Sequence, residues 1–128
     1  MTLSNETPAE NSGFNQSTDP RQVEVFALRE IAQRLVSAQN NPEDIAGLLQ
    51  VVRLNWRLWT IFQTSILDSD CPLSIEIRSN ILSLSNFVDK HTADIIAAPV
   101  PSKLDVLIRI NRDLADGLSG TIAPSPQP

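Results

Sequence analysis

Apolar residues recur at helical spacing through the middle of the chain, between residues 42 and 67. At about 100° per residue, a helix over this segment gathers most of its apolar side chains on one broad face. That face carries Leu48, Val51, Val52, Trp59, Phe62 and Ile66, with the amide of Asn55 at its centre. The opposite polar stripe, about 60° wide, carries Gln50, Arg53, Arg57, Thr60 and Thr64. The pattern therefore predicts a central helix that other elements cover around most of its circumference.

A first helix is predicted to open at Asp19-Pro20-Arg21-Gln22. Asp19 is a suitable cap for a free amide, Pro20 is tolerated at the first helical position, and Gln22 completes a capping-box pattern. Its apolar face is Leu28, Ile31, Leu35 and Ala38, flanked by Phe26, Ala27 and Ala32, while Glu30, Gln33, Arg34 and Ser37 look outward. Asn40-Asn41-Pro42 predicts the end of this helix and the cap of the central one, with Pro42 as its first residue.

Two more helices follow the break at Asp68–Pro72. The third is predicted to begin between Pro72 and Ser74 and to end before Pro99, with the stripe Ile77, Ile81, Leu84, Val88, His91, Thr92 and Ile95. Ser102-Lys103-Leu104-Asp105 resembles a capping box that opens the fourth, and Gly117 or Gly120 is expected as its left-handed C-terminal cap. The apolar face of the fourth helix is Leu104, Leu107, Ile108, Asn111, Leu114 and Leu118.

No segment shows the sustained alternation or hairpin turns that indicate strands. The sequence therefore predicts an all-α fold, a compact bundle of about four helices. We expect the folded domain to span residues 19–118. Residues 1–18 are polar and offer little to bury, so we expect a disordered N-terminal tail; residues 119–128, with three prolines, suggest a flexible C-terminal tail.

Composition limits the function classes. The 128 residues carry a formal net charge of -5, which disfavours a general nucleic-acid or anionic-membrane binder. Cys71 is the only cysteine and His91 the only histidine, so neither an intramolecular disulfide nor a Cys/His zinc site is expected. Residues 1–18 lack the features of a targeting segment and no segment is apolar enough to cross a membrane, so we expect a cytoplasmic protein.

The sequence offers little for catalysis, and we expect no enzyme activity, no cofactor and no metal. His91 lies on an apolar stripe, where a hydrogen-bonded structural histidine is the commoner role. Cys71 lies between acidic residues and Pro72, which disfavours the reactive thiolate.

Two asparagines are more informative than these titratable groups. Asn55 and Asn111 each fall in the middle of an apolar face. A buried amide without a partner costs about 1–3 kcal/mol. We therefore expect the two amides to bond to each other or to loop backbone, and so to fix the register of the second and fourth helices.

Arg53 and Arg57 lie one turn apart on the polar stripe of the central helix. They form either a solvated face or an anchor for a partner's carboxylate or phosphate. Apolar residues border the stripe, and aromatic or aliphatic side chains beside arginine are typical of protein-binding hot spots. The candidate partner-binding residues are Arg53, Leu54, Trp56, Arg57 and Ile61.

Several blocks of the chain, in this order and spacing, resemble the FlaF flagellar biosynthesis regulators of alphaproteobacteria. Asn55, Arg57, Leu58, Trp59 and Phe62 resemble that family's Asn-Arg-Arg-Leu-Trp-x-x-Phe signature, with Trp56 in place of the first arginine. The further matching blocks are Leu73–Arg78, Ser83–Val88, His91-Thr92, Leu107–Arg112 and Gly117-Leu118. Ser74 and Phe87 depart from the family's proline and tryptophan. From these blocks we take Asn55, Leu58, Trp59, Phe62, Arg78 and Asn111 as signature residues with a structural role.

The resemblance implies a small cytoplasmic, non-enzymatic protein that promotes flagellin synthesis and export. Flagellin is the implied partner, bound in a chaperone-like manner. The alternative is a post-transcriptional regulator that contacts flagellin mRNA or the FlbT regulator. Direct RNA binding is the weaker hypothesis, because Arg53, Arg57 and Arg78 are the only candidate residues for a basic groove.

Overall fold

The computed structural model describes residues 20–120, and these form an all-α bundle. The helices are α2 (Pro20–Gln39), α3 (Ile45–Ile66), α4 (Ile75–Ala97) and α5 (Leu104–Ser119), with the 3-10 helix η2 (Pro101–Lys103) leading into α5. The predicted fold class is confirmed. Of the predicted tails, residues 1–18 lie outside the described residues, as do residues 121–128, whereas Ser119 is the last residue of α5.

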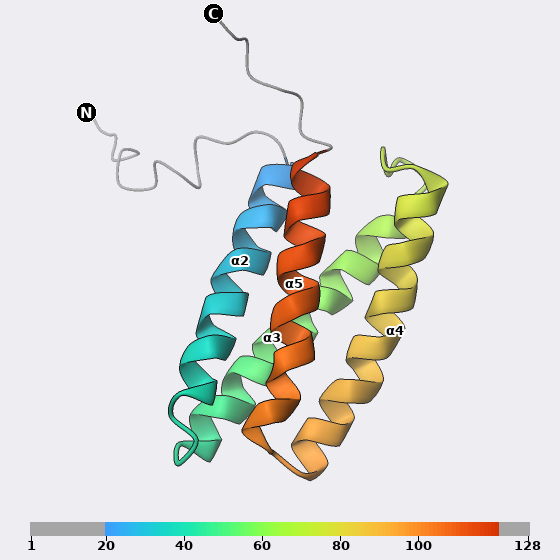
Figure 1. Ribbon diagram of the computed structural model, residues 1–128. Coiled ribbons are helices and arrows are strands. Elements are labelled where there is room, and N and C mark those ends of the chain that lie inside the picture. The colour runs from blue at the N-terminus through green and yellow to red at the C-terminus, as the bar shows by residue number, and fades with distance from the viewer. Residues whose placement is uncertain (1–19, 121–128) are drawn as a thin grey trace, which may run out of the picture.

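The four helices form two pairs. α2 and α5 run side by side and share the most extensive contact, and α4 packs mainly against α3 (Figure 1). α3 passes behind the other helices in this view and also packs against α2, so it connects the two pairs. This central position explains why the apolar face of α3 is the broadest in the sequence.

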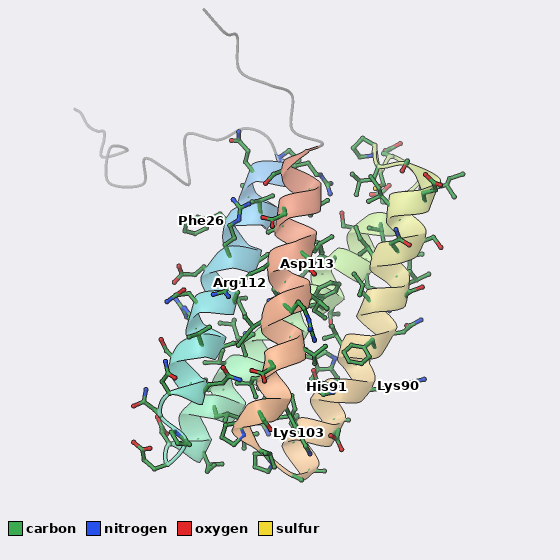
Figure 2. The ribbon with its side chains drawn as sticks, in the orientation of Figure 1. Phe26, Lys90, His91, Lys103, Arg112 and Asp113 are labelled. Atoms are coloured by element: carbon green, nitrogen blue, oxygen red, sulfur yellow. The ribbon has the colours of Figure 1, made fainter. Side chains whose placement is uncertain are left out.

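The buried positions follow the helical periodicity. Leu28, Leu35, Leu48, Val52, Val88 and Leu107 are fully enclosed, together with Trp59 at the centre. Val51, Ile77, Leu84 and Leu114 were expected in the core but are only half-buried. On α4 the buried residues include Ser85, next to the half-buried Leu84 of the predicted stripe. Phe26, one of the residues flanking the face of the first helix, is 55% exposed and projects from α2 (Figure 2).

The predicted start of the central helix is wrong by three residues. α3 begins at Ile45 and not at Pro42, and its N-cap is Asp44, whose side chain accepts a hydrogen bond from the amide of Gly47 at 2.9 Å. Asn41 instead donates its side-chain amide to the carbonyl of Ser37 at 2.8 Å, so it closes the end of α2. The third helix begins within one residue of the predicted range, with Ser74 as its N-cap.

Both predicted caps of the fourth helix are also corrected. η2 precedes α5, the N-cap position is Lys103, and no side chain caps this end, so the expected capping box at Ser102 is not formed. Asp105, the last residue of that box, accepts a hydrogen bond from Gln39 at 2.6 Å instead. Gly120 has φ of -70° and Gly117 lies inside the helix, so neither forms a left-handed cap.

Candidate functional site

The outer face of α3 carries two arginines without side-chain partners. Arg53 and Arg57 are exposed, and neither forms an ion pair or side-chain hydrogen bond within residues 20–120. Thr60 and Thr64 on the same stripe donate to the carbonyls of Trp56 and Thr60, one turn earlier in the helix. The hydroxyls are therefore satisfied within the helix, and the guanidinium groups are charged groups left for a partner.

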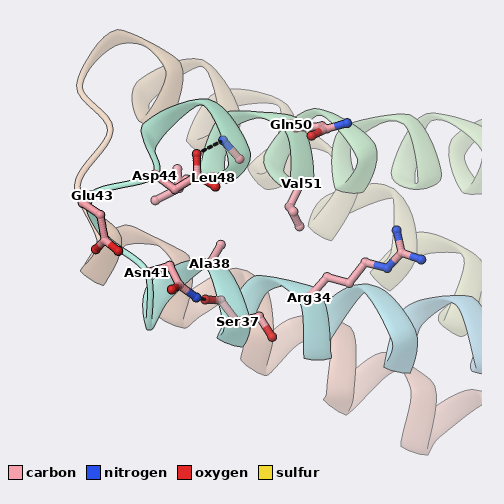
Figure 3. Close-up of a pocket in the computed structure, with 10 residues that line it drawn as sticks. Arg34, Ser37, Ala38, Asn41, Glu43, Asp44, Leu48, Gln50 and Val51 are labelled. Carbon is pink, nitrogen blue, oxygen red and sulfur yellow. Dashed lines mark hydrogen bonds between the residues drawn. The ribbon is translucent and has the colours of Figure 1, made fainter.

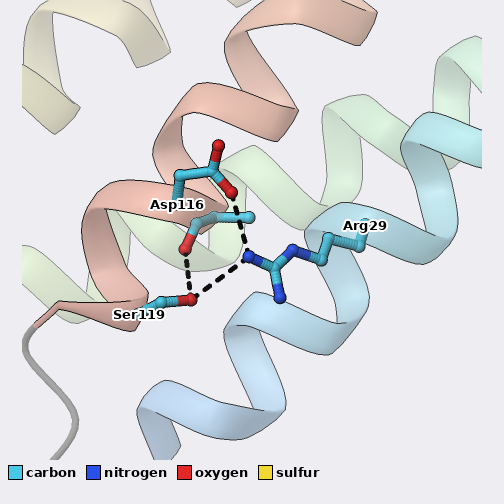
Figure 4. Close-up of polar contacts among 4 residues, drawn as sticks. Arg29, Asp116 and Ser119 are labelled. Atoms are coloured by element: carbon cyan, nitrogen blue, oxygen red, sulfur yellow. Dashed lines mark hydrogen bonds and ion pairs between the residues drawn. The ribbon is translucent and has the colours of Figure 1, made fainter.

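One arginine of the other pair of helices is engaged differently. Arg29 of α2 donates to Asp116 of α5 at 2.9 Å and to the hydroxyl of Ser119 at 3.3 Å (Figure 4). Ser119 in turn donates to the carbonyl of Ala115. This exposed network links α2 to α5, whereas Arg53 and Arg57 link no elements.

A groove runs between α2 and α3 beside these arginines. Its first half, of about 550 Å³, is lined by Arg34 of α2 and by Ala46, Gln50, Val51, Arg53, Leu54 and Arg57 of α3. A second half continues toward the loop between the helices and shares Arg34, Gln50 and Val51 (Figure 3). Arg34 extends from α2 toward α3, and Glu43 and Asp44 lie at the loop end (Figure 3).

The groove contains three of the five candidate partner-binding residues. Arg53, Leu54 and Arg57 line it, whereas Trp56 and Ile61 do not. Trp56 borders the arginines on the side of α3 that meets α4, is 40% exposed, and its indole N–H donates to Asp89 of α4 at 2.8 Å. Ile61, 60% exposed, lies one turn beyond Arg57. The candidates therefore share the outer face of α3, but Trp56 and Ile61 lie outside the groove.

Arg34 lines the groove, but the sequence did not single it out as a candidate site residue. It was expected only to look outward from α2, and it forms an exposed ion pair with Glu30 at 3.2 Å. Its position opposite Arg53 and Arg57 depends on how α2 packs against α3. The pattern of apolar residues within one helix does not show how that helix packs against another.

The signature asparagines form the expected contact. Asn111 of α5 donates its side-chain amide to the oxygen of Asn55 at 2.7 Å, and its own oxygen accepts the indole N–H of Trp59 at 2.9 Å. All three side chains are fully buried. The network ties α3 to α5 in one register, and it leaves the Nδ2 of Asn55 without a hydrogen bond.

The other signature residues also make structural contacts. Phe62 packs edge-on against Trp59, with ring centroids 5.7 Å apart, and Leu58 packs half-buried against the core. Arg78 donates its Nε to the carbonyl of Ile66 at 3.1 Å, so it satisfies a backbone acceptor at the end of α3. Each of these contacts stabilises the bundle rather than presenting a group to solvent.

His91 also makes structural contacts. Its ring stacks on Phe87 with centroids 5.1 Å apart, and its Nε2 donates to the carbonyl of Lys103 at 2.7 Å (Figure 2). Cys71 is half-buried in the loop before α4. Within residues 20–120 no group of three His, Cys, Asp or Glu side chains is placed to hold a metal ion. In the same range no helix is long and apolar enough to cross a bilayer.

Comparison with known proteins identifies one relationship. The family model described as flagellar protein FlaF matches residues 9–118, so the match covers the four helices except Ser119, the last residue of α5, and begins within the stretch expected to be a tail. No curated protein and no solved structure matches the chain. Because the family model covers most of the 128 residues, the chain belongs to the FlaF family of flagellar proteins.

Proposed function

We propose that this flagellar protein promotes flagellin synthesis and export by binding flagellin as a chaperone-like, non-enzymatic partner in the cytoplasm. Its flagellar role follows from its family. The observation that carries the rest is the outer face of α3, where Arg53 and Arg57 have no side-chain partner within residues 20–120 and lie near exposed apolar side chains.

The composition of this face favours a protein partner. Trp56 and Ile61 keep 40% and 60% of their surface in solvent, and Leu54 is half-buried beside the arginines. Tryptophan and arginine are enriched at the centres of protein interfaces, where they combine apolar contact with directed hydrogen bonds. A helical segment laid across α3 would cover these side chains and pair the arginines.

The alternative is a regulator that contacts flagellin mRNA or FlbT. Arginines also bind phosphate, so Arg53 and Arg57 fit an RNA backbone in chemistry. The net charge of -5 opposes it, because RNA binding relies on a basic surface. Trp56 is also held by Asp89, which leaves its ring less free to stack on a base.

The direct test is calorimetry of the folded protein with flagellin from the same cell. We expect binding, and we expect Arg57→Ala and Trp56→Ala each to weaken it by about 5- to 30-fold, the effect of losing about 1–2 kcal/mol. Arg112→Ala removes an exposed arginine from α5 and serves as the matched control. Circular dichroism checks that every variant is folded. If the wild-type protein shows no association with flagellin, the proposal is wrong.

A further inference from the structure

The groove between α2 and α3 has an uneven charge distribution. Arg34, Arg53 and Arg57 line one half, and the other lining residues of that half are neutral. Arg53 and Arg57 carry full charges with no side-chain partner among residues 20–120, and the ion pair of Arg34 with Glu30 is exposed and therefore weak. A cationic groove on a chain with net charge -5 selects an anionic occupant.

The spacing of the arginines indicates the form of that occupant. Arg53 and Arg57 are one turn apart, so they lie about 6 Å apart along the axis of α3. Two carboxylates one turn apart on a partner helix have the same spacing. Val51 and Leu54 are half-buried between α2 and the arginines and provide an apolar surface for such a helix. Arginine binds carboxylate in a bidentate geometry, which fixes the position of the partner.

The opposite charges at the loop end give the occupant a direction. Glu43 and Asp44 line that end of the groove, about 20 Å along α3 from Arg57 at 1.5 Å per residue. A helix carries partial positive charge at its N-terminus and partial negative charge at its C-terminus. An occupant of about 13 residues would therefore lie with its N-terminus beside Glu43 and its C-terminal half beside the arginines.

We propose that this groove binds an acidic, amphipathic helical segment of flagellin, with two carboxylates one turn apart on Arg53 and Arg57. This inference rests on the proposed function and specifies where and how flagellin is held. It assigns Arg34 a role as the third cation of the site, contributed by the neighbouring helix.

The test uses overlapping 15-residue peptides that cover flagellin, with binding measured by fluorescence polarisation against the full chain. We expect the tightest peptide to carry two acidic residues one turn apart in its C-terminal half. The Arg53→Glu/Arg57→Glu variant should bind it at least about 30-fold more weakly, since two attractive pairs become repulsive. A peptide with those two acids changed to lysine should bind this variant and not the wild type.

The control makes the same charge change elsewhere. Arg109 and Arg112 of α5 are exposed and have no ion pair within residues 20–120. Arg112 lies on the face turned to the viewer, whereas α3 runs behind it (Figure 2). Arg109→Glu/Arg112→Glu should leave peptide affinity within about twofold, because these charges lie outside the groove.

The outcomes separate the two proposals. If flagellin binds the wild type and the Arg53→Glu/Arg57→Glu variant equally, the groove assignment is wrong and flagellin binding stands. If flagellin does not bind the wild type, both fall. A second copy in the groove would appear as a dimer that the variant loses in light scattering. That result overturns the proposal.

Discussion

At the residue scale, Asn111 satisfies two buried polar groups at once. Its side-chain N–H donates to the side-chain oxygen of Asn55, and its own side-chain oxygen accepts the indole N–H of Trp59. Asn111→Ala leaves both groups buried and without a partner, at about 1–3 kcal/mol each. We therefore expect the free energy of unfolding, measured in urea, to fall by about 2–6 kcal/mol.

The matched control is Asn86→Ala, which removes an exposed amide from α4 and should change stability by less than about 0.5 kcal/mol. The Asn55→Ala/Asn111→Ala pair should cost less than the sum of its single changes, because the two side chains share one hydrogen bond. Additive losses would show that the amides act independently and would contradict the network.

The sequence predicted part of this network. Helical periodicity placed Asn55 and Asn111 on apolar faces, and burial then required partners for both. Their pairing with each other was one of two alternatives, and the bond from Trp59 was not foreseen. Which buried donor reaches which acceptor depends on the rotation and translation of α3 relative to α5. A one-dimensional pattern does not contain that information.

At the element scale, the two helical glycines should respond oppositely to alanine. Glycine in a helix interior costs up to about 1 kcal/mol relative to alanine. An added Cβ at Gly117 of α5 meets no atom within 4 Å, so Gly117→Ala should raise the free energy of unfolding by about 0.5–1 kcal/mol. A Cβ at Gly47 instead collides with the carboxylate of Asp44, which caps α3. Moving that cap costs about 1 kcal/mol, so Gly47→Ala should bring no gain.

Urea unfolding of the two variants makes the comparison. The Asp44→Ala/Gly47→Ala double variant provides the control: with the carboxylate gone, alanine at position 47 should be more stable than glycine in the same background. Equal stabilisation by Gly47→Ala and Gly117→Ala would show that Asp44 does not cap α3.

The errors in predicting the elements have a common cause. Between Asn40 and Asp44 the chain offers several side chains that can cap a helix, and Pro42 suits the first position of one. The structure uses Asn41 for the end of α2 and Asp44 for the start of α3. Local signals establish that a boundary exists, but similar caps a few residues apart compete, and tertiary packing decides between them.

At the scale of the whole molecule, the candidate site brings together residues from two different helices. Arg53 and Arg57 were predicted together because they share one helix face. Arg34 joins them only through the packing of α2 against α3. The same packing separates Trp56 from the groove, although it lies next to Arg57 in the sequence. Faces of single helices are therefore predictable, whereas sites between helices need the fold.

The position of α3 also predicts how the bundle unfolds. α3 packs against α2 and α4 and bonds to α5 through Asn111, and one cluster of buried residues extends over both helix pairs. We expect one cooperative transition. In a Trp56→Phe variant, Trp59 is the remaining tryptophan, so its fluorescence follows the junction of α3 and α5 while circular dichroism follows all helices. The two signals should coincide in urea.

Two core variants extend this test. Leu35→Ala on α2 and Ile95→Ala on α4 each create a cavity in a fully buried site, and each should lower the free energy of unfolding reported by both signals by about 2–5 kcal/mol. If Leu35→Ala displaced the circular dichroism transition but not the fluorescence of Trp59, α2 would unfold separately from the junction of α3 and α5, and the bundle would not unfold as one unit.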